Sequence, residues 1–288
     1  MKLGVITDGI SRDFAYALAV MEGAGLRHAE LQFLWGAEVG DLDAGERRLA
    51  AELIDAHGVE IPCVSRHVFG GLSVMDTVES DAAYTEHLDG LKRCIELAQS
   101  VACPRVRIMS FRKEMILFGS HGADVWNVSA GAWAKLVGLI EPAVRVAEDA
   151  GVTLVVETGN NAMVTSAHLA GKLIDDIGSP NLRALWDPCN SLYCNEPSFP
   201  DGYDALHGGK LGHVHIKDGR VDIPRASVSC TALGDGDMAP HLAPIADALR
   251  SDGYAGVVSL ESVYRPDGGT FEDGFLASLD TFRRLFGA

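Results

Sequence analysis

The chain alternates between short apolar segments and longer amphipathic segments from one end to the other, and the pair repeats eight times. The apolar segments are five to seven residues long and rich in Val, Ile and Leu, which is typical of strands buried on both faces of a parallel sheet. Because parallel strands need a crossover connection, usually a helix, this pattern favours an α/β fold with a parallel sheet. The predicted strands are 2–7, 29–34, 61–66, 105–111, 153–158, 183–187, 212–217 and 256–262.

The segments between the strands have apolar residues at helical spacing, and most of them end at a glycine, as a left-handed helix C-cap requires. The predicted helices are 13–25, 44–58, 81–101, 130–151, 166–178, 240–253 and 271–287. The stretch after the sixth strand, YDALHG at 203–208, has only a weak helical pattern.

Four of the predicted strands end at a side chain that can bind a metal ion. These side chains are Glu157, Asp187, His215 and Glu261. A buried carboxylate or imidazole costs several kcal/mol of desolvation unless it is paired, hydrogen-bonded or metal-bound. One such residue has many explanations, including a strand-end ion pair, but four at equivalent positions suggest a shared divalent cation.

These positions also distinguish a closed barrel from an open sheet. In an open sheet the fifth to eighth strands would spread over roughly 15 Å, too far for one cation to bind all four side chains. In a (β/α)₈ barrel of roughly 250 residues, the C-terminal strand ends surround one site. No glycine-rich nucleotide-binding motif follows the first strand. The sequence therefore predicts a single TIM-barrel domain over residues 1–288.

Three oxygen donors and one nitrogen donor are typical of a catalytic divalent cation rather than a structural tetrahedral zinc. The set favours Mn²⁺, with Mg²⁺, Co²⁺ or Zn²⁺ as alternatives. His213 and His215 are two residues apart on one strand, so both face the same side. Because His215 is nearer the C-terminal end, we expect it to be the ligand and His213 to lie deeper in the barrel.

Four short segments follow one another in this order: VVET, LWDP, HVHIKD and VSLE. The last of them ends a longer segment, LGDGDMAPHLAPIADALRSDGYAGVVSLE. In these segments the chain resembles the sugar phosphate isomerase/epimerase family, which has the xylose-isomerase-like barrel. The family includes ketose 3-epimerases, hydroxypyruvate isomerase, inosose dehydratase and endonuclease IV. The resemblance is strongest over residues 150–265. It implies that Glu157, Asp187, His215 and Glu261 bind the metal, that the two glutamates form a catalytic acid/base pair, and that the protein is a homodimer or homotetramer.

The expected chemistry follows from such a site. A cation that holds the carbonyl and a neighbouring hydroxyl of a sugar stabilises the enediolate formed when the adjacent C–H proton leaves. If Glu157 and Glu261 flank the sugar, they can move a proton between its two faces, which is epimerisation; if one glutamate serves both carbons, the result is isomerisation. A lyase or decarboxylase acting on an acidic keto-sugar derivative, and a non-catalytic sugar-binding barrel, remain alternatives.

Further residues at strand ends are candidates for binding a small carbohydrate or sugar acid. In ketose 3-epimerases a substrate-contacting His follows the metal-binding Asp by three residues, and Asn190 takes that place here. Lys217 lies on the face of His215, where it could hold a carboxylate or phosphate or assist proton transfer. The candidate substrate-binding residues are Asn190, Lys217, Arg220, His67, Lys113 and Trp186. The long segments 67–78, 111–128, 188–203 and 219–237 follow strands on the same side.

The charge of the chain bears on its partners. With 24 Lys and Arg against 40 Asp and Glu, the net charge is −16, which repels a nucleic-acid backbone. No signal sequence and no run of roughly 18 apolar residues is present, so neither a membrane span nor export is expected. We expect a cytoplasmic protein without a nucleic-acid or membrane partner.

Overall fold

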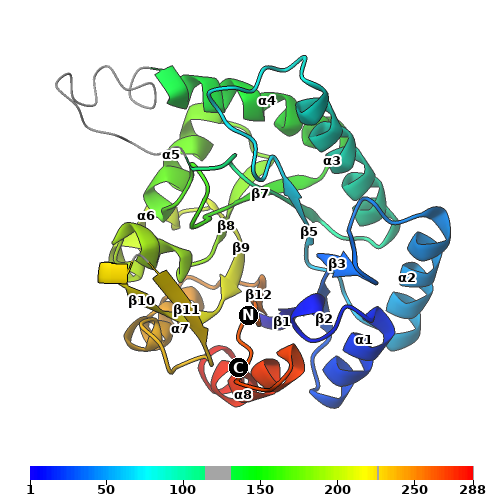
Figure 1. The fold of residues 1–288 in the computed structure, drawn as a ribbon, viewed down its shortest axis with the longest axis vertical. Coiled ribbons are helices and arrows are strands. Elements are labelled where there is room, and N and C mark those ends of the chain that lie inside the picture. Colours follow the sequence, from blue (N-terminus) through cyan, green and yellow to red (C-terminus); the bar gives the residue numbers. More distant parts are fainter. Residues whose placement is uncertain (114–130, 226, 288) are drawn as a thin grey trace.

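A computed structural model describes residues 1–113, 131–225 and 227–287 and shows a barrel of parallel strands surrounded by helices (Figure 1). Eight strands form one sheet in the order β2-β1-β12-β9-β8-β7-β6-β5, and every neighbouring pair is parallel. Two bridges, His28 to Glu60 and Leu31 to Val64, join the two ends of this order and close the ring. The predicted TIM barrel is confirmed.

The barrel strands lie close to the apolar segments of the sequence. They are β1 (Lys2–Ile6), β2 (His28–Glu30), β5 (Val64–Val68), β6 (Arg105–Ile108), β7 (Thr153–Glu157), β8 (Leu182–Trp186), β9 (Leu211–Ile216) and β12 (Val257–Leu260). The helices are α1 (Phe14–Gly23), α2 (Ala44–His57), α3 (Ala82–Ser100), α4 (Trp133–Ala150), α5 (Ala167–Ile177), α6 (Tyr203–Leu206), α7 (Ala239–Ser251) and α8 (Phe271–Phe286). The four-residue α6 corresponds to the weak pattern at YDALHG.

Three predicted strands differ from the observed ones by three residues or more at one end, and one of them, predicted at 105–111, ends at Ile108. The strand predicted at 61–66 begins at Val64 rather than at residue 61, because Pro62 has no N–H group to donate to a ladder. The segment predicted as 29–34 ends as a barrel strand at Glu30 and then enters a hairpin of β3 (Phe33–Leu34) and β4 (Ala37–Glu38). Its two-residue turn has positive φ at Trp35 and Gly36, 52° and 91°, as a tight hairpin turn requires.

Helix termini follow the capping signals of the sequence. Asp43 forms a capping box with Glu46 at the start of α2. Gly58, Gly151 and Gly178 end α2, α4 and α5 in the left-handed conformation. The apolar faces of the helices pack on the outer face of the sheet and form the main core, whereas a small separate cluster consists of Cys63, Val155 and Leu185.

Strand β9 contains a bulge at Gly212. Ala184 of β8 pairs with Leu211, but the next residue, Leu185, pairs with His213, so Gly212 is an extra residue in the ladder. A Cβ atom at Gly212 would lie 2.6 Å from the Cβ of Arg183, closer than real side chains approach. The bulge sets His213 opposite Leu185, which faces the barrel interior.

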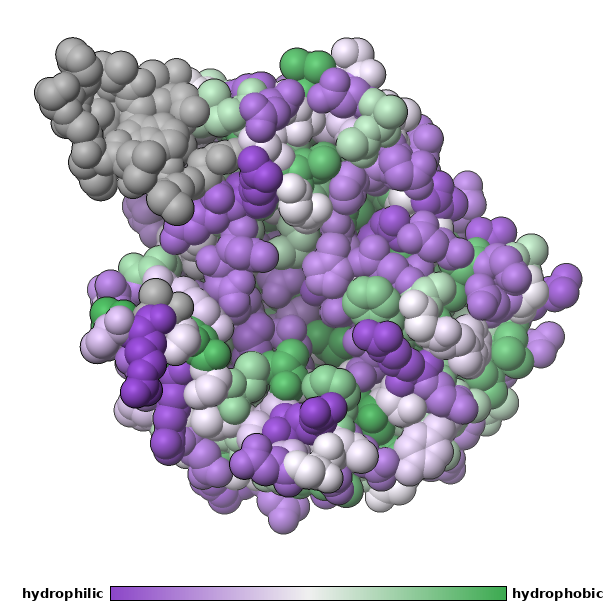
Figure 2. Space-filling view, viewed as in Figure 1, coloured by the Kyte–Doolittle hydropathy of each residue, from purple (hydrophilic) through white to green (hydrophobic). Residues whose placement is uncertain are grey.

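The strands end beneath one face of the molecule, which is hollowed at its centre and predominantly hydrophilic there (Figure 2). The second hairpin, β10 (Asp218–Asp222) with β11 (Ser227–Thr231), follows β9 on this side. Of the long segment predicted at 111–128, residues 114–128 lie outside the described residues. Among the helices that the structure describes, none has the length and apolarity needed to cross a bilayer.

Candidate metal centre

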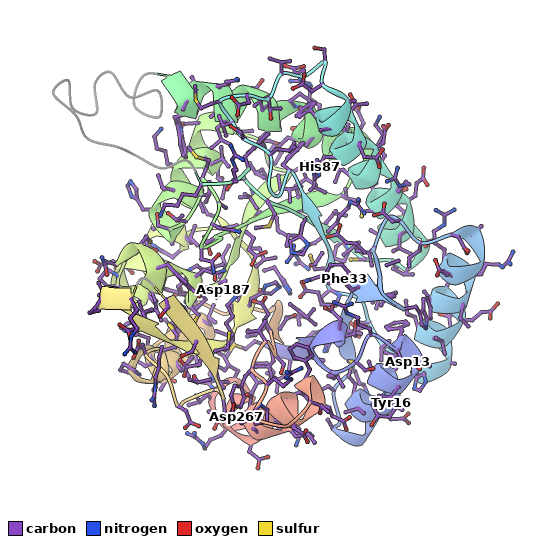
Figure 3. All side chains as sticks on the ribbon, in the orientation of Figure 1. Asp13, Tyr16, Phe33, His87, Asp187 and Asp267 are labelled. Atoms are coloured by element: carbon purple, nitrogen blue, oxygen red, sulfur yellow. The ribbon has the colours of Figure 1, made fainter. Side chains whose placement is uncertain are left out.

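The structure brings the four predicted ligands together at the C-terminal ends of β7, β8, β9 and β12. One donor atom from each of Glu157, Asp187, His215 and Glu261 lies within 4.8 Å of all the others. Figure 3 shows Asp187 at the edge of the central hollow, whereas Asp13 and Tyr16 lie at the outside of the barrel. Three carboxylates and an imidazole therefore face one small volume.

Asp187 is held in place from several directions. Its Oδ1 accepts the backbone N–H of Cys189 at 3.0 Å and of Asn190 at 3.3 Å. The side-chain amide of Asn190 donates to Asp187 Oδ2 at 3.0 Å and to the carbonyl of Thr158 at 2.8 Å. Asn190, predicted as a substrate contact, thus orients Asp187, and its buried Oδ1 finds no partner among the described residues.

Glu157 is paired with Arg107, a residue that the sequence alone does not single out. Arg107 Nη1 lies 2.9 Å from Glu157 Oε2, and both side chains are buried. The guanidinium is itself fixed, because Nη2 donates to the carbonyl of Ser65 at 2.9 Å. The signal in the sequence was an arginine within the apolar strand RVRI, next to its C-terminal residue. Arg107 leaves Glu157 Oε1 directed toward His215, 3.9 Å from its Nδ1.

Glu30 is the second residue that sequence reasoning missed. This fully buried carboxylate accepts hydrogen bonds from Nε2 of both His213 and His215, each at 2.8 Å, and from the hydroxyl of Ser65. Burial would raise the pKa of Glu30, but the two imidazoles hold it well below its usual range. A glutamate inside the apolar segment AELQFL was the available signal. His213 lies deeper than His215 and bonds to Glu30 and Ser259, in agreement with its expected position.

His215 offers the clearest test of whether this chain could hold a cation. Because its Nε2 is bonded to Glu30, its Nδ1 is the atom that faces the carboxylates, 3.9 Å from Glu261 Oε2. That Nδ1 is buried and has no hydrogen-bond partner among the described residues. Burial would lower the pKa of His215, but the surrounding carboxylates raise it to about 9. The site thus attracts positive charge to Nδ1, and its oxygen and nitrogen donors fit a divalent metal ion.

Lys217 reaches the same carboxylates. Its Nζ lies 2.5 Å from Asp187 Oδ2 and 2.6 Å from Glu261 Oε2. Burial would raise the pKa of Glu261, but Lys217 and His215 lower it to about 2. Burial raises the pKa of Asp187 to about 7, although Lys217 opposes this shift. Lys217 therefore belongs to the cluster itself.

The other predicted substrate contacts lie farther from the cluster. His67 is on the barrel rim, where its Nδ1 contacts Glu38 Oε1 at 2.6 Å. Lys113 is exposed. Arg220 is exposed on β10 and donates to the carbonyl of Asp235. Trp186 is fully buried against Tyr203 of α6, because consecutive strand residues face opposite sides and its neighbour Asp187 faces the interior. The structure does not bring Arg220 or Trp186 into the cluster.

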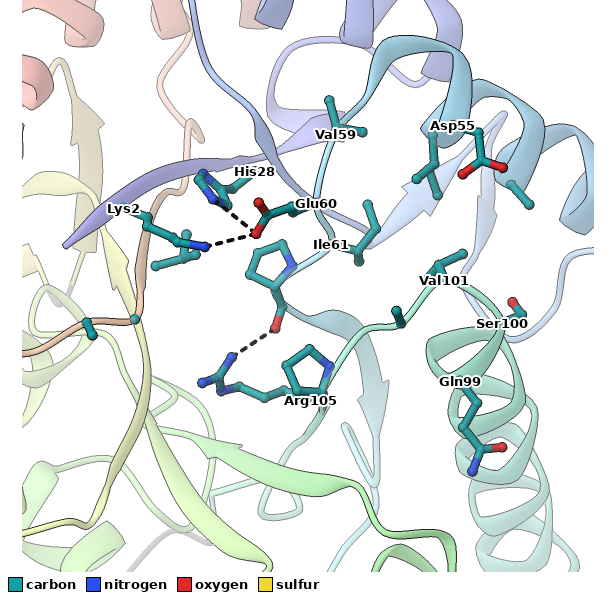
Figure 4. A pocket seen from close by; sticks show the side chains of 18 residues that line it. Lys2, His28, Asp55, Val59, Glu60, Ile61, Gln99, Ser100, Val101 and Arg105 are labelled. Carbon is teal, nitrogen blue, oxygen red and sulfur yellow. Dashed lines mark hydrogen bonds and ion pairs between the residues drawn. The ribbon is translucent and has the colours of Figure 1, made fainter.

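Two cavities differ in their relation to this centre. A cavity of about 310 Å³ borders Glu261 and is also lined by Asp8, Arg12 and Gln32. A larger one, about 660 Å³, lies at the opposite, N-terminal end of the strands (Figure 4). There Glu60 pairs with Lys2, and Arg105 donates to the carbonyl of Pro62. The smaller cavity is the one that adjoins the cluster, so we assign it to the substrate side.

Comparison with known proteins gives consistent results. Residues 18–285 match the family described as a xylose isomerase-like TIM barrel. Over 151 residues the chain is 28% identical to L-ribulose 3-epimerase of Mesorhizobium japonicum. This match covers 51% of the chain and 46% of the relative, so it spans about half the length of each.

Solved structures extend the likeness in fold to nearly the whole chain. D-psicose 3-epimerase of Clostridium cellulolyticum, solved with D-tagatose, has a TM-score of 0.72 at 16% identity, with 100% of each chain covered. The IOLI protein, solved with a bound zinc atom, has a TM-score of 0.70 at 18% identity, with 99% of this chain and 98% of that one covered.

Proposed function

Because the chain belongs to the xylose isomerase-like TIM barrel family, we propose that it is a divalent-metal-dependent isomerase or epimerase of a small sugar or sugar derivative. The observation that carries this proposal is the meeting of four donor atoms from four strand ends within 4.8 Å. The Nδ1 of His215, which has no hydrogen-bond partner in the described part of the chain, supports a cation rather than a purely structural ion-pair network. The epimerase names of the relatives point to the same class of substrate.

In this proposal Glu157, Asp187, His215 and Glu261 bind the cation, with Mn²⁺ favoured by the donor set. When bound, the cation would stabilise the negative charge that develops on a sugar carbonyl oxygen as the neighbouring proton leaves. Asn190 and the backbone N–H groups beside it keep Asp187 oriented. Glu30 keeps His215 oriented with Nδ1 toward the other donors.

Glu157 and Glu261 act as the proton-transferring pair. They come from β7 and β12, and two strands, β8 and β9, separate these in the sheet. The two carboxylates therefore approach the centre from different sides, as proton transfer between the two faces of a carbon requires. Each has a cation beside it in this structure, Arg107 for Glu157 and Lys217 for Glu261.

The test is to measure metal content of the purified protein and then to incubate it with ketoses, sugar phosphates and keto sugar acids in D₂O, read by NMR. We expect bound Mn²⁺ or a related ion, and deuterium at one carbon of a recovered or isomerised sugar. Asp187→Asn should abolish both metal binding and exchange. Glu52→Gln, which changes an exposed carboxylate on α2, is the matched control.

The outcomes separate the alternatives. Release of CO₂ or loss of water from an acidic keto sugar would show that the protein is a lyase and not an isomerase. Metal binding without any exchange across the panel would favour a sugar-binding barrel. A wild-type protein that binds no divalent metal would overturn the proposal.

A further inference from the structure

Lys217 contacts the same oxygen atoms that the proposed cation would use. Its Nζ lies 2.5 Å from Asp187 Oδ2 and 2.6 Å from Glu261 Oε2, and its side chain is 13% exposed. Glu261 Oε2 is also the carboxylate oxygen 3.9 Å from His215 Nδ1. The ammonium therefore lies among the donor atoms, and not beside them at the rim.

A metal ion and the ammonium of Lys217 would compete for these oxygens. Divalent ions such as Mg²⁺ and Zn²⁺ bind oxygen at about 2.0–2.2 Å, so an ion bound to Asp187 Oδ2 and Glu261 Oε2 would lie within a few ångströms of Nζ. At such a separation the repulsion between a divalent ion and an ammonium group is strong in a buried site. Lys217 in its present position therefore weakens the binding of a metal ion to these oxygens.

The second cation of the cluster is held quite differently. Arg107 donates to the carbonyl of Ser65 and approaches the side-chain oxygen of Gln32, so it is anchored independently of Glu157. The ammonium of Lys217 has only the two carboxylates as partners among the described residues. Its four-carbon stem also has many rotamers. Arg107 is thus a fixed part of the site, whereas Lys217 can leave.

We propose that Lys217 is a built-in competitor of the divalent cation: it neutralises Asp187 and Glu261 until the metal displaces its ammonium toward the open mouth of the barrel. This inference rests on the proposed function, because it assumes that the four donors bind a metal. Displacement would put a positive charge beside the substrate side of Glu261. There it can bind an oxygen of the sugar derivative.

The experiment is a titration of wild type, Lys217→Met and Lys210→Met with Mn²⁺. Electron paramagnetic resonance measures the concentration of free Mn²⁺ at each step. Lys210 is the matched control, since it pairs with Asp175 at 2.6 Å away from the cluster and its loss changes the net charge equally. We expect Lys217→Met to bind Mn²⁺ at least ten-fold tighter than wild type, and Lys210→Met to bind it as wild type does. If circular dichroism shows that Lys217→Met does not fold, Lys217→Gln takes its place, since its amide group can still donate a hydrogen bond to the carboxylates.

The results distinguish this inference from the proposed function. Mn²⁺ binding that is unchanged or weaker in the Lys217 variants overturns the competition while leaving the metal site intact. Absence of Mn²⁺ binding in all the proteins overturns the proposed function and the inference with it.

A second measurement follows the displacement directly. Reductive methylation read by mass spectrometry should modify Lys217 slowly without Mn²⁺ and faster with it. Lys92, with a side chain 53% exposed on α3, should react equally in both conditions. Slower methylation of Lys217 in Mn²⁺ would contradict displacement.

Discussion

Glu157 and Glu261 are equivalent in the sequence, but the structure gives them different neighbours. Arg107 holds one oxygen of Glu157, whereas Lys217 holds Glu261 and also contacts Asp187. The two glutamates are therefore paired with two different cations, Arg107 and Lys217.

The first prediction concerns these two glutamates. Glu157→Gln and Glu261→Gln should each lower turnover by at least about 10²-fold, the range typical of acid/base residues, because an amide cannot accept the substrate proton. Initial rates of deuterium exchange measure the effect, and circular dichroism checks the fold. Near-wild-type exchange in either variant would remove that residue from the mechanism.

Glu30 carries the second prediction. In Glu30→Gln the amide group would offer an N–H to one of two imidazoles that now both donate to the carboxylate, so the orientation of His215 would no longer be enforced. Loss of a buried carboxylate behind a ligating histidine typically weakens metal binding by about 10–100-fold. Calorimetric titration with Mn²⁺ would show it, and an unchanged affinity would mean that Glu30 serves only the packing of the core.

The third prediction compares the two histidines. His215→Asn should lose more bound metal than His213→Asn, because of the two it is His215 that has a nitrogen 3.9 Å from Glu157 and Glu261. Metal content of the purified variants, by atomic spectroscopy, decides between them. The reverse order would identify His213 as the ligand.

For single residues, the sequence identified site residues at the ends of strands better than site residues within strands. Glu157, Asp187, His215 and Glu261 were visible because a polar residue interrupts an apolar run at its C-terminal end. Strand alternation would have excluded Trp186, the direct neighbour of Asp187, from the interior. Glu30 and Arg107 were harder to identify, because their partners come from strands distant in the sequence and only the closed barrel brings them together.

Among the elements, the bulge in β9 has the largest effect on the centre. An unbulged β9 would shift by one residue against β8 and turn His213 and His215 toward the helices. Glycine is required at the extra position because Arg183 and Val155 leave no room for a side chain.

The fourth prediction tests this glycine. Gly212→Ala should destabilise the protein by about 1–3 kcal/mol, as overpacking in a filled interior does. Gly138→Ala is the matched control: a Cβ there meets nothing within 4 Å, so alanine in the middle of α4 should stabilise by about 0.5–1 kcal/mol. Urea unfolding at pH 7 measures both. Equal stability of Gly212→Ala and wild type would show that the bulge can relax.

The order and type of the barrel strands and helices could be read from the sequence, but not all their limits, and the β3–β4 and β10–β11 hairpins were not predicted. Pro62 and the Trp35–Gly36 turn explain two of the displaced strands, and both signals are local. The bulge has no local signal beyond a glycine, since it arises from the pairing of β9 with β8 and is defined only in the assembled sheet.

For the whole molecule, the fifth prediction links metal binding to stability. An ion that binds only the folded protein adds about 2.7 kcal/mol at a concentration 100 times its Kd. For a domain of this size the melting temperature should rise by roughly 5 °C with Mn²⁺ and fall again with a chelator. Asp187→Asn should lack the shift, and calorimetry of both proteins checks it. An equal rise in Asp187→Asn would place the stabilising ion elsewhere.

Neighbouring strands of the barrel are joined by ladders of different lengths. β1 pairs with β12 through four residue pairs, Lys2 to Val257 through Val5 to Leu260. The join between β2 and β5 consists of two isolated bridges. The sheet is thus continuous across the two ends of the chain and weakest within its first quarter. During synthesis on the ribosome, β1 emerges long before β12 and must wait for it to complete their shared ladder.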